Sequence, residues 1–136
     1  MLAFSEIYCH FVWRISDDSP KLDKLTRRLA ENFIRDFDEK FGYECISVCA
    51  LADHIHFLAK LLPGVAPGLL IVRIKDELSE YLKVKLAMNT PPRWDNRYGI
   101  VSVSKSHLEI VKKYVETQKI RHRDGKLNKT LERTKT

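Results

Sequence analysis

Residues 51–62 read Leu-Ala-Asp-His-Ile-His-Phe-Leu-Ala-Lys-Leu-Leu, and the fold prediction is built outward from this stretch. Successive side chains of a β-strand point to opposite faces, so residues of one parity share a face. On one face of this stretch the residues are apolar (Ile55, Phe57, Ala59, Leu61), whereas the other face begins with His54 and His56. Buried imidazoles need hydrogen-bond partners, so a packing face rarely carries two in succession. The pattern predicts a strand with one core face and a second face on which His54 and His56 could hold one metal ion.

Hydrophobic periodicity on either side of this strand predicts the remaining elements. Alternating apolar residues indicate strands, and apolar residues at every third or fourth position indicate helices; the predicted strands are 3–15, 43–51, 51–62 and 98–104, and the predicted helices are 21–41, 68–87 and 106–122. Gly42 is expected to cap the first helix. The first six elements follow the order β-α-β-β-α-β, which is the ferredoxin-like arrangement that RNA-recognition modules share. The expected fold class is therefore α+β, an antiparallel sheet with helices on one face and the histidines on an open face.

The length and the net charge of the chain indicate how many domains it forms and what kind of partner it binds. With 136 residues it is expected to form one domain over residues 1–123, followed by a basic, loosely held tail over 124–136 whose residues are almost all polar. The net charge of +6 favours an anionic partner, of which nucleic acid is the commonest.

The cysteines and the apolar segments bear on the compartment. Cys45 and Cys49 are four residues apart in a predicted strand, so they are expected to share a face; with Cys9 they are interpreted as small buried hydrophobic residues in a reducing compartment. The sequence shows neither a signal peptide nor an apolar run long enough to cross a bilayer. A cytoplasmic protein is expected.

The last predicted helix carries two polar residues beside its packing flank. Leu108, Val111 and Val115 define that flank, and Tyr114 and Gln118 lie next to each other at i and i+4 on the adjoining flank. The helix by itself favours simple packing for Tyr114 and exposure to solvent for Gln118. The alternative is that the hydroxyl and the carboxamide reach a shared site.

These motifs together resemble a known family. The chain is similar to the single-tyrosine transposases of small bacterial and archaeal insertion sequences, which belong to the HUH (His-hydrophobic-His) endonucleases, and to their relatives that act on repetitive extragenic palindromes. The order and size of the elements match over roughly residues 4–123, and the matching motifs are Asp53-His54-Ile55-His56-Phe57-Leu58, Trp94 with residues 97–104, and Tyr114-Val115-Glu116-Thr117-Gln118.

The resemblance implies a site and a reaction. His54 and His56 would be ligands of a divalent cation, Mg²⁺ or Mn²⁺, with Gln118 as a further ligand. Tyr114 would attack single-stranded DNA to form a covalent 5′-phosphotyrosine, and DNA hairpins at the element ends would be recognised. The resemblance also implies a homodimer, in which the tyrosine helix of one subunit can complete the site of the other, and a cytoplasmic location at the nucleoid. Ala52 stands where proline is frequent, which leaves this chemistry undisturbed.

Other residues could contact DNA. Arg93, Trp94, Arg97 and Tyr98 alternate cations with aromatic rings, which suits phosphates and stacked bases, although simple loop packing is an equal alternative. The late basic residues, a solvated surface in the other interpretation, are further candidates for phosphate contacts: Lys112, Lys113, Arg121 and Arg123.

Asp53 and the remaining histidines are less informative. Asp53 could orient a histidine, but a turn role is favoured. His10 is expected to have a hydrogen-bonded structural role, and the pattern assigns no role to His107 or His122.

Competing functions make different demands on the sequence. A zinc hydrolase needs a third His, Cys or carboxylate ligand near His54 and His56, and a histidine-triad nucleotide enzyme would need a histidine where Leu58 stands, so both are disfavoured. The remaining alternative is a non-catalytic nucleic-acid-binding regulator descended from such a transposase. The presence of Tyr114 and Gln118 beside the two histidines argues against lost catalysis.

Overall fold

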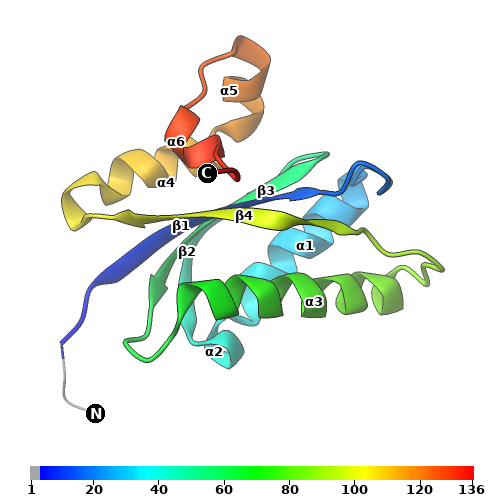
Figure 1. Cartoon of the computed structure of the whole chain (residues 1–136), viewed down its shortest axis with the longest axis horizontal. Coiled ribbons are helices and arrows are strands. Elements are labelled where there is room, and N and C mark those ends of the chain that lie inside the picture. Colours follow the sequence, from blue (N-terminus) through cyan, green and yellow to red (C-terminus); the bar gives the residue numbers. More distant parts are fainter. Residues whose placement is uncertain (1–3) are drawn as a thin grey trace.

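A four-stranded antiparallel sheet forms the centre of the protein in the computed structural model, which describes residues 4–136 (Figure 1). Its strands are β1 (Ile7–Ile15), β2 (Tyr43–Ala50), β3 (His54–Leu61) and β4 (Trp94–Val103), in the spatial order β2-β3-β1-β4. This confirms the predicted ferredoxin-like α+β fold. The predicted first strand started at Ala3, which lies outside the described residues.

Three helices cover one face of the sheet, below it in Figure 1: α1 (Lys24–Asp36), α2 (Asp38–Phe41) and α3 (Pro67–Lys85). The single helix predicted over 21–41 divides at Phe37, whose φ of −101° and ψ of 19° are not helical. Gly42 ends α2 with a φ of 84°, a left-handed conformation that glycine adopts without strain, as predicted. Within residues 4–136, no helix is both long and apolar enough to cross a membrane.

The face of β3 opposite its histidines belongs to the main hydrophobic core. Ile55, Phe57 and Leu61 are almost completely buried, and the Phe57 ring stacks on that of Phe11 from β1 with centroids 5.1 Å apart. The strand parity predicted for residues 54–61 is thus confirmed, because the apolar residues of one parity all enter this core.

The second face of the sheet is covered as well, which makes the prediction of an open face wrong. A short 3₁₀ turn, η1 (Lys105–His107), leads into α4 (Leu108–Glu116) and α5 (Gln118–Asp124), which lie above the sheet in Figure 1. The helix predicted over 106–122 therefore divides at Thr117. A second apolar cluster seals α4 onto the strands: Tyr8, Cys49, Leu51, Leu58, Val103 and Val115.

The C-terminal segment, for which a loosely held tail was expected over 124–136, contains a short helix. Residues Lys129–Glu132 form a short helix, α6, whose N-cap Asn128 accepts a hydrogen bond from the Leu131 N–H group. Leu131 is only 6% exposed, so this segment packs against the domain. Its near-absence of apolar residues concealed this packing in the sequence.

A β-bulge changes the expected placement of two cysteines. Cys45 pairs with Ala59 and Ser47 pairs with the next residue, Leu58, so one extra residue is inserted in β2 between them. The extra residue reverses the parity of the rest of the strand, so that Cys45 packs on the main core and Cys49 in the second cluster. The prediction that the two share a face is wrong. Cys9 and Cys49 are buried, as predicted, whereas Cys45 is only partly buried.

Gly99 permits the close approach of the C-terminal segment to the sheet. A Cβ atom at this position would collide with the carbonyl oxygen of Arg133 and would lie 2.9 Å from a methyl group of Val12. A strand glycine at such a place allows another backbone to come near.

We expect Gly99→Ala to displace residues 126–136 from the sheet without unfolding it, because the collision is with that segment. Hydrogen exchange measured by mass spectrometry should accelerate in these residues while β1 and β3 stay protected. Gly64→Ala is the matched control, since a Cβ there meets nothing within 4 Å. Unchanged exchange in the Gly99 variant would contradict this packing.

Candidate metal and tyrosine site

The strand β3 holds two histidines side by side on the second face of the sheet, both almost fully buried, with His56 at 0% exposure. The Nδ1 atom of His54 lies 2.6 Å from Oδ1 of Asp53, and the Nδ1 atom of His56 lies 3.0 Å from Nε2 of His10. Each ring is thus held at Nδ1, which leaves both Nε2 atoms facing one place. His10 has the hydrogen-bonded role expected of it, and Asp53 orients a histidine, the interpretation that the sequence favoured less.

Two residues from the C-terminal helices complete the cluster. The Nε2 atom of His122 in α5 lies 3.2 Å from Nε2 of His54, and Oε1 of Glu132 in α6 lies 3.2 Å from Nε2 of His56. One ligand atom from each of the four residues lies within 4.8 Å of the others. His122 follows Gln118 by four residues, which places it on the same helix flank and could have indicated it; nothing in the sequence pattern indicates Glu132.

Gln118 contacts one member of the cluster, His122. Its buried side chain donates from Nε2 to the Tyr114 carbonyl oxygen at 2.8 Å, and its Oε1 accepts from Nε2 of His122 at 2.9 Å. In this chain the carboxamide oxygen therefore contacts the same nitrogen of His122 that lies 3.2 Å from Nε2 of His54. A direct ligand role for Gln118 stays a prediction.

The Tyr114 hydroxyl meets the cluster through Glu132. It donates to Oε2 of Glu132 at 2.5 Å and accepts from the Asn128 N–H group at 2.9 Å, and the residue is 4% exposed. The Tyr114 ring stands edge-on to that of His56, with centroids 5.9 Å apart, and the Arg121 guanidinium lies 4.9 Å from the Tyr114 ring centre. The tyrosine and the histidines that the sequence singled out are thus brought together within one chain.

The site combines an ionised carboxylate with neutral imidazoles. Burial alone would raise the pKa of Glu132, but hydrogen bonds with His54 and His56 outweigh it and hold that pKa well below its usual range. Burial lowers the pKa of His10 to about 3 and also lowers the pKa of His56 and of His122. Burial, followed by the hydrogen bond to Glu132, raises the pKa of Tyr114, so the phenol is protonated at neutral pH.

This donor set fits a divalent cation. Three imidazole nitrogens (His54, His56, His122) and one carboxylate oxygen (Glu132) converge in a buried place. Imidazole suits Mn²⁺ and its transition-metal neighbours better than Mg²⁺, which prefers oxygen ligands. The third ligand whose absence disfavoured a zinc hydrolase is present in His122 and Glu132, so the number of ligands alone does not decide between a hydrolase and a transposase.

The two aromatic candidates for DNA contact, Trp94 and Tyr98, pack against the main hydrophobic core. The indole Nε1 of Trp94 donates to the Lys75 carbonyl oxygen at 3.0 Å, and its ring lies edge-on to Trp13 in the main core. Tyr98 packs on the same core, with Nζ of Lys75 5.7 Å from its ring centre. Of the two alternatives, packing is the one that the structure favours for both rings.

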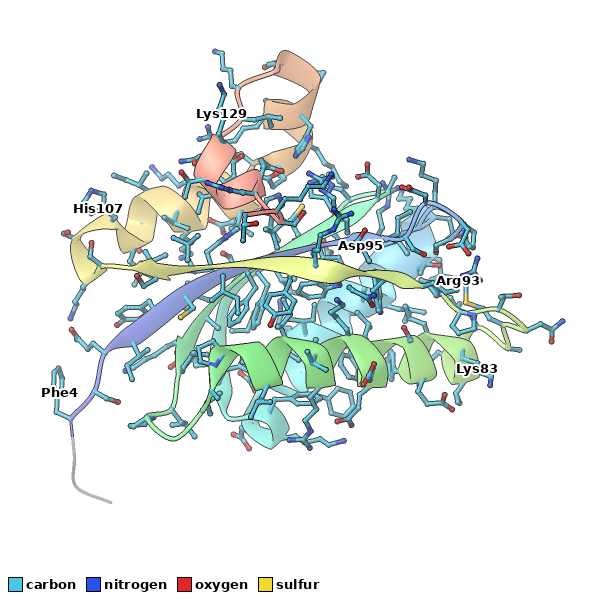
Figure 2. The ribbon with its side chains drawn as sticks, in the orientation of Figure 1. Phe4, Lys83, Arg93, Asp95, His107 and Lys129 are labelled. Atoms are coloured by element: carbon cyan, nitrogen blue, oxygen red, sulfur yellow. The ribbon has the colours of Figure 1, made fainter. Side chains whose placement is uncertain are left out.

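The basic candidates divide into two groups. Arg93 contacts the Asp18 carbonyl oxygen, and Arg97 forms two hydrogen bonds of 2.8 Å with Asp95; Figure 2 shows Arg93 and Asp95 at the far end of β4 from His107. The second group lies on the two helices that carry Tyr114 and Gln118, and comprises Lys112, Lys113, Arg121 and Arg123. Lys112 and Lys113 share α4 with the tyrosine, and Arg121 and Arg123 lie on the next helix, α5.

The fold and the cluster define a ferredoxin-like domain with a tyrosine at a candidate metal centre. Residues 3–118 match the family described as IS200-like transposases. A solved structure of a candidate transposase from Deinococcus radiodurans R1 is 16% identical, with a TM-score of 0.68 over 87% of this chain and 95% of that one. A REP-associated tyrosine transposase, solved bound to a REP hairpin, is 12% identical, with a TM-score of 0.65 over 90% of this chain and 72% of that one. No curated protein sequence matches the chain.

The chain therefore belongs to the IS200-like transposases. Its enzyme class is that of the tyrosine transposases, and its general function is that of a DNA transposase.

We expect His122→Ala to weaken Mn²⁺ binding by roughly 100-fold or more, because it removes a ligand, and Gln118→Ala by about 10-fold at most, because it removes only a polar neighbour of the ligating nitrogen of His122. Isothermal titration of the full chain with Mn²⁺ measures both, and His107→Ala, an exposed histidine, is the matched control. A larger loss for Gln118→Ala than for His122→Ala would show that Gln118 binds the ion directly.

Proposed function

We propose that this transposase cleaves and rejoins single-stranded DNA through a covalent 5′-phosphotyrosine on Tyr114, in a reaction that depends on a divalent cation. The observation that carries the proposal is the position of Glu132, whose carboxylate contacts both the Tyr114 hydroxyl and Nε2 of His56. The nucleophile and the cation ligands thus share one carboxylate in a single buried place.

The residues of the site have distinct roles in this proposal. The Tyr114 oxygen attacks the scissile phosphorus, an O–P bond forms, and the bond to the departing 3′ oxygen breaks. The proton lost by the phenol balances the one gained by that oxygen, which leaves as a 3′-hydroxyl. A phenol with a raised pKa is a poor nucleophile, and the Glu132 carboxylate accepts the hydrogen bond of its hydroxyl and so orients it for attack. His54, His56, His122 and Glu132 would hold the divalent cation, which would supply positive charge for the phosphate oxygens.

The covalent intermediate explains how cleavage can be followed by rejoining. The phosphotyrosine ester keeps the phosphate at the diester level, so a 3′-hydroxyl from another strand can attack it and release Tyr114. No nucleotide cofactor is required, because no new high-energy bond has to be made.

DNA hairpins are the proposed substrate. The REP-associated tyrosine transposase that shares this fold was solved with a hairpin bound, and the net charge of this chain is +6. We assign phosphate contacts first to the basic residues of the tyrosine-bearing helix α4 and of the next helix, α5, which are Lys112, Lys113, Arg121 and Arg123. Arg121 is the most direct of these, since its guanidinium lies against the Tyr114 ring.

A homodimer is part of the proposal, as the family resemblance implies. Within one chain Tyr114 already lies against His56, so we propose that each subunit holds a complete site in this arrangement. Exchange of the tyrosine helices between subunits, which would make the sites composite, is the alternative.

We expect the protein to form a covalent adduct with labelled single-stranded DNA hairpins taken from its own genomic flanks, in Mg²⁺ or Mn²⁺, and Tyr114→Phe to abolish the adduct. A denaturing gel detects it. Tyr81→Phe, on α3 at the other face of the sheet, is the matched control and should form the adduct normally.

Two outcomes would contradict parts of the proposal. An adduct that persists in Tyr114→Phe would refute the nucleophile. Binding of the hairpins without any adduct, with either ion and across the flanking sequences, would favour the non-catalytic regulator.

A mixing experiment tests the arrangement of the dimer. His54→Ala retains Tyr114 and Tyr114→Phe retains the histidines, so a mixture restores adduct formation only when one subunit supplies the tyrosine to the other. We expect the mixture to stay inactive, because the structure holds both parts in one chain. Light scattering on the same samples measures the dimer itself, and an adduct in the mixture would show that the sites are composite.

A further inference from the structure

The contact between His10 and His56 restricts where protons can lie on both rings. His10 projects from β1 onto the second face of the sheet and is fully buried, and its Nε2 atom lies 3.0 Å from Nδ1 of His56. The rings are tilted by 41° with centroids 5.1 Å apart. The other nitrogen of His10, Nδ1, is buried and has no hydrogen-bond partner among the described residues.

The carboxylate of Glu132 determines the tautomers of the metal-free state. A neutral imidazole has one N–H group and one bare nitrogen. Because the ionised carboxylate only accepts hydrogen bonds, Nε2 of His56 carries the proton that faces it, 3.2 Å away. Nδ1 of His56 is then bare, so Nε2 of His10 must carry the proton and donate. The unpartnered Nδ1 of His10 is left as a bare nitrogen, and buried acceptors without a partner are less rare in proteins than buried N–H groups without one.

Cation binding requires the opposite arrangement. To act as a ligand, Nε2 of His56 must be bare, so the proton of that ring moves to Nδ1 and faces His10. Nε2 of His10 must then accept, and the proton of His10 moves to its Nδ1. The number of protons on the two rings does not change. The Nε2 proton of His10 passes to Nδ1 of His56, and the Nε2 proton of His56 leaves to solvent. One solvent proton then arrives at Nδ1 of His10.

We propose that His10 is a positioning residue of the metal site, which holds the His56 ring at Nδ1 and changes tautomer together with it when a divalent cation binds. The inference rests on the metal site of the proposed function and not on the chemistry of Tyr114. Nothing but His10 contacts Nδ1 of His56 among the side-chain hydrogen bonds of residues 4–136, so no other side chain of that part of the chain performs this role.

Variants at position 10 separate positioning from packing. His10→Phe keeps an aromatic ring but removes the contact, and it should weaken Mn²⁺ binding by about 10- to 100-fold, the range seen when a partner of a metal ligand is lost. His10→Gln retains a polar group that can reach His56 and should restore most of the affinity. Isothermal titration of the full chain measures both, with His107→Phe as the exposed control, and thermal unfolding without metal reports any general loss of stability.

A spectroscopic measurement on the unaltered protein keeps the inference testable even when a variant fails to fold. Long-range proton–nitrogen-15 NMR spectra of the five histidines, assigned by substitution, report the protonated nitrogen of each ring. His10 and His56 should both carry the proton on Nε2 without metal and both on Nδ1 after addition of Zn²⁺, a diamagnetic probe.

The outcomes distinguish this inference from the proposed function. Full Mn²⁺ affinity in His10→Phe, or a His10 ring that keeps its Nε2 proton with Zn²⁺ bound, would overturn the role of His10 while leaving the metal site in place. Failure of the unaltered protein to bind Mn²⁺ or Zn²⁺ would overturn both.

Discussion

Two imidazoles buried on one face of a sheet need a hydrogen-bond partner at each of their four nitrogens, and this need organises the second half of the fold. An unpaired buried polar group costs about 1–3 kcal/mol. His54 is satisfied by Asp53 and His122, and His56 by His10 and Glu132. These partners come from the β2–β3 turn, α5, β1 and α6. Segments far apart in the sequence are thus brought to one place by two adjacent side chains of β3.

The position of the C-terminal segment follows from the same need. Its apolar contribution is small: Leu131 is the buried hydrophobic residue of α6, and its burial is worth about 2 kcal/mol. Polar contacts add to this, since Glu132 meets the histidines and Asn128 donates its N–H group to the Tyr114 hydroxyl. Gly99 provides the space that lets the C-terminal backbone reach the sheet. The segment is thus held mainly by polar contacts with residues of the site, and the absence of a Cβ at Gly99 makes room for its backbone.

The hydrophobic periodicity of the sequence predicted those parts of the structure that depend on residues close together in the chain. The parity of residues 54–61 was sufficient to place the core and the histidine pair, because a half-buried strand imposes a period of two. The bulge in β2 was not predicted, since one inserted residue leaves the apolar composition unchanged. Glu132 was missed because its role depends on where a polar segment folds back across the sheet, which no periodicity encodes. The pattern assigned no role to His122, although it lies four residues after Gln118 in α5 and its Nε2 atom lies 3.2 Å from that of His54.

The charges of the site affect the order in which the cation and the DNA phosphate bind to it. Glu132 stays ionised because its pKa is lowered, while burial keeps His10, His56 and His122 neutral, so the cluster presents one negative charge and several nitrogen lone pairs. Arg14 lies 4.0 Å from Glu132 but is partly exposed, so water screens most of its charge. A phosphodiester is itself an anion and would be repelled by Glu132 in this state, whereas a divalent cation would be attracted to it. The electrostatics of the site therefore favour the cation first and the DNA phosphate second.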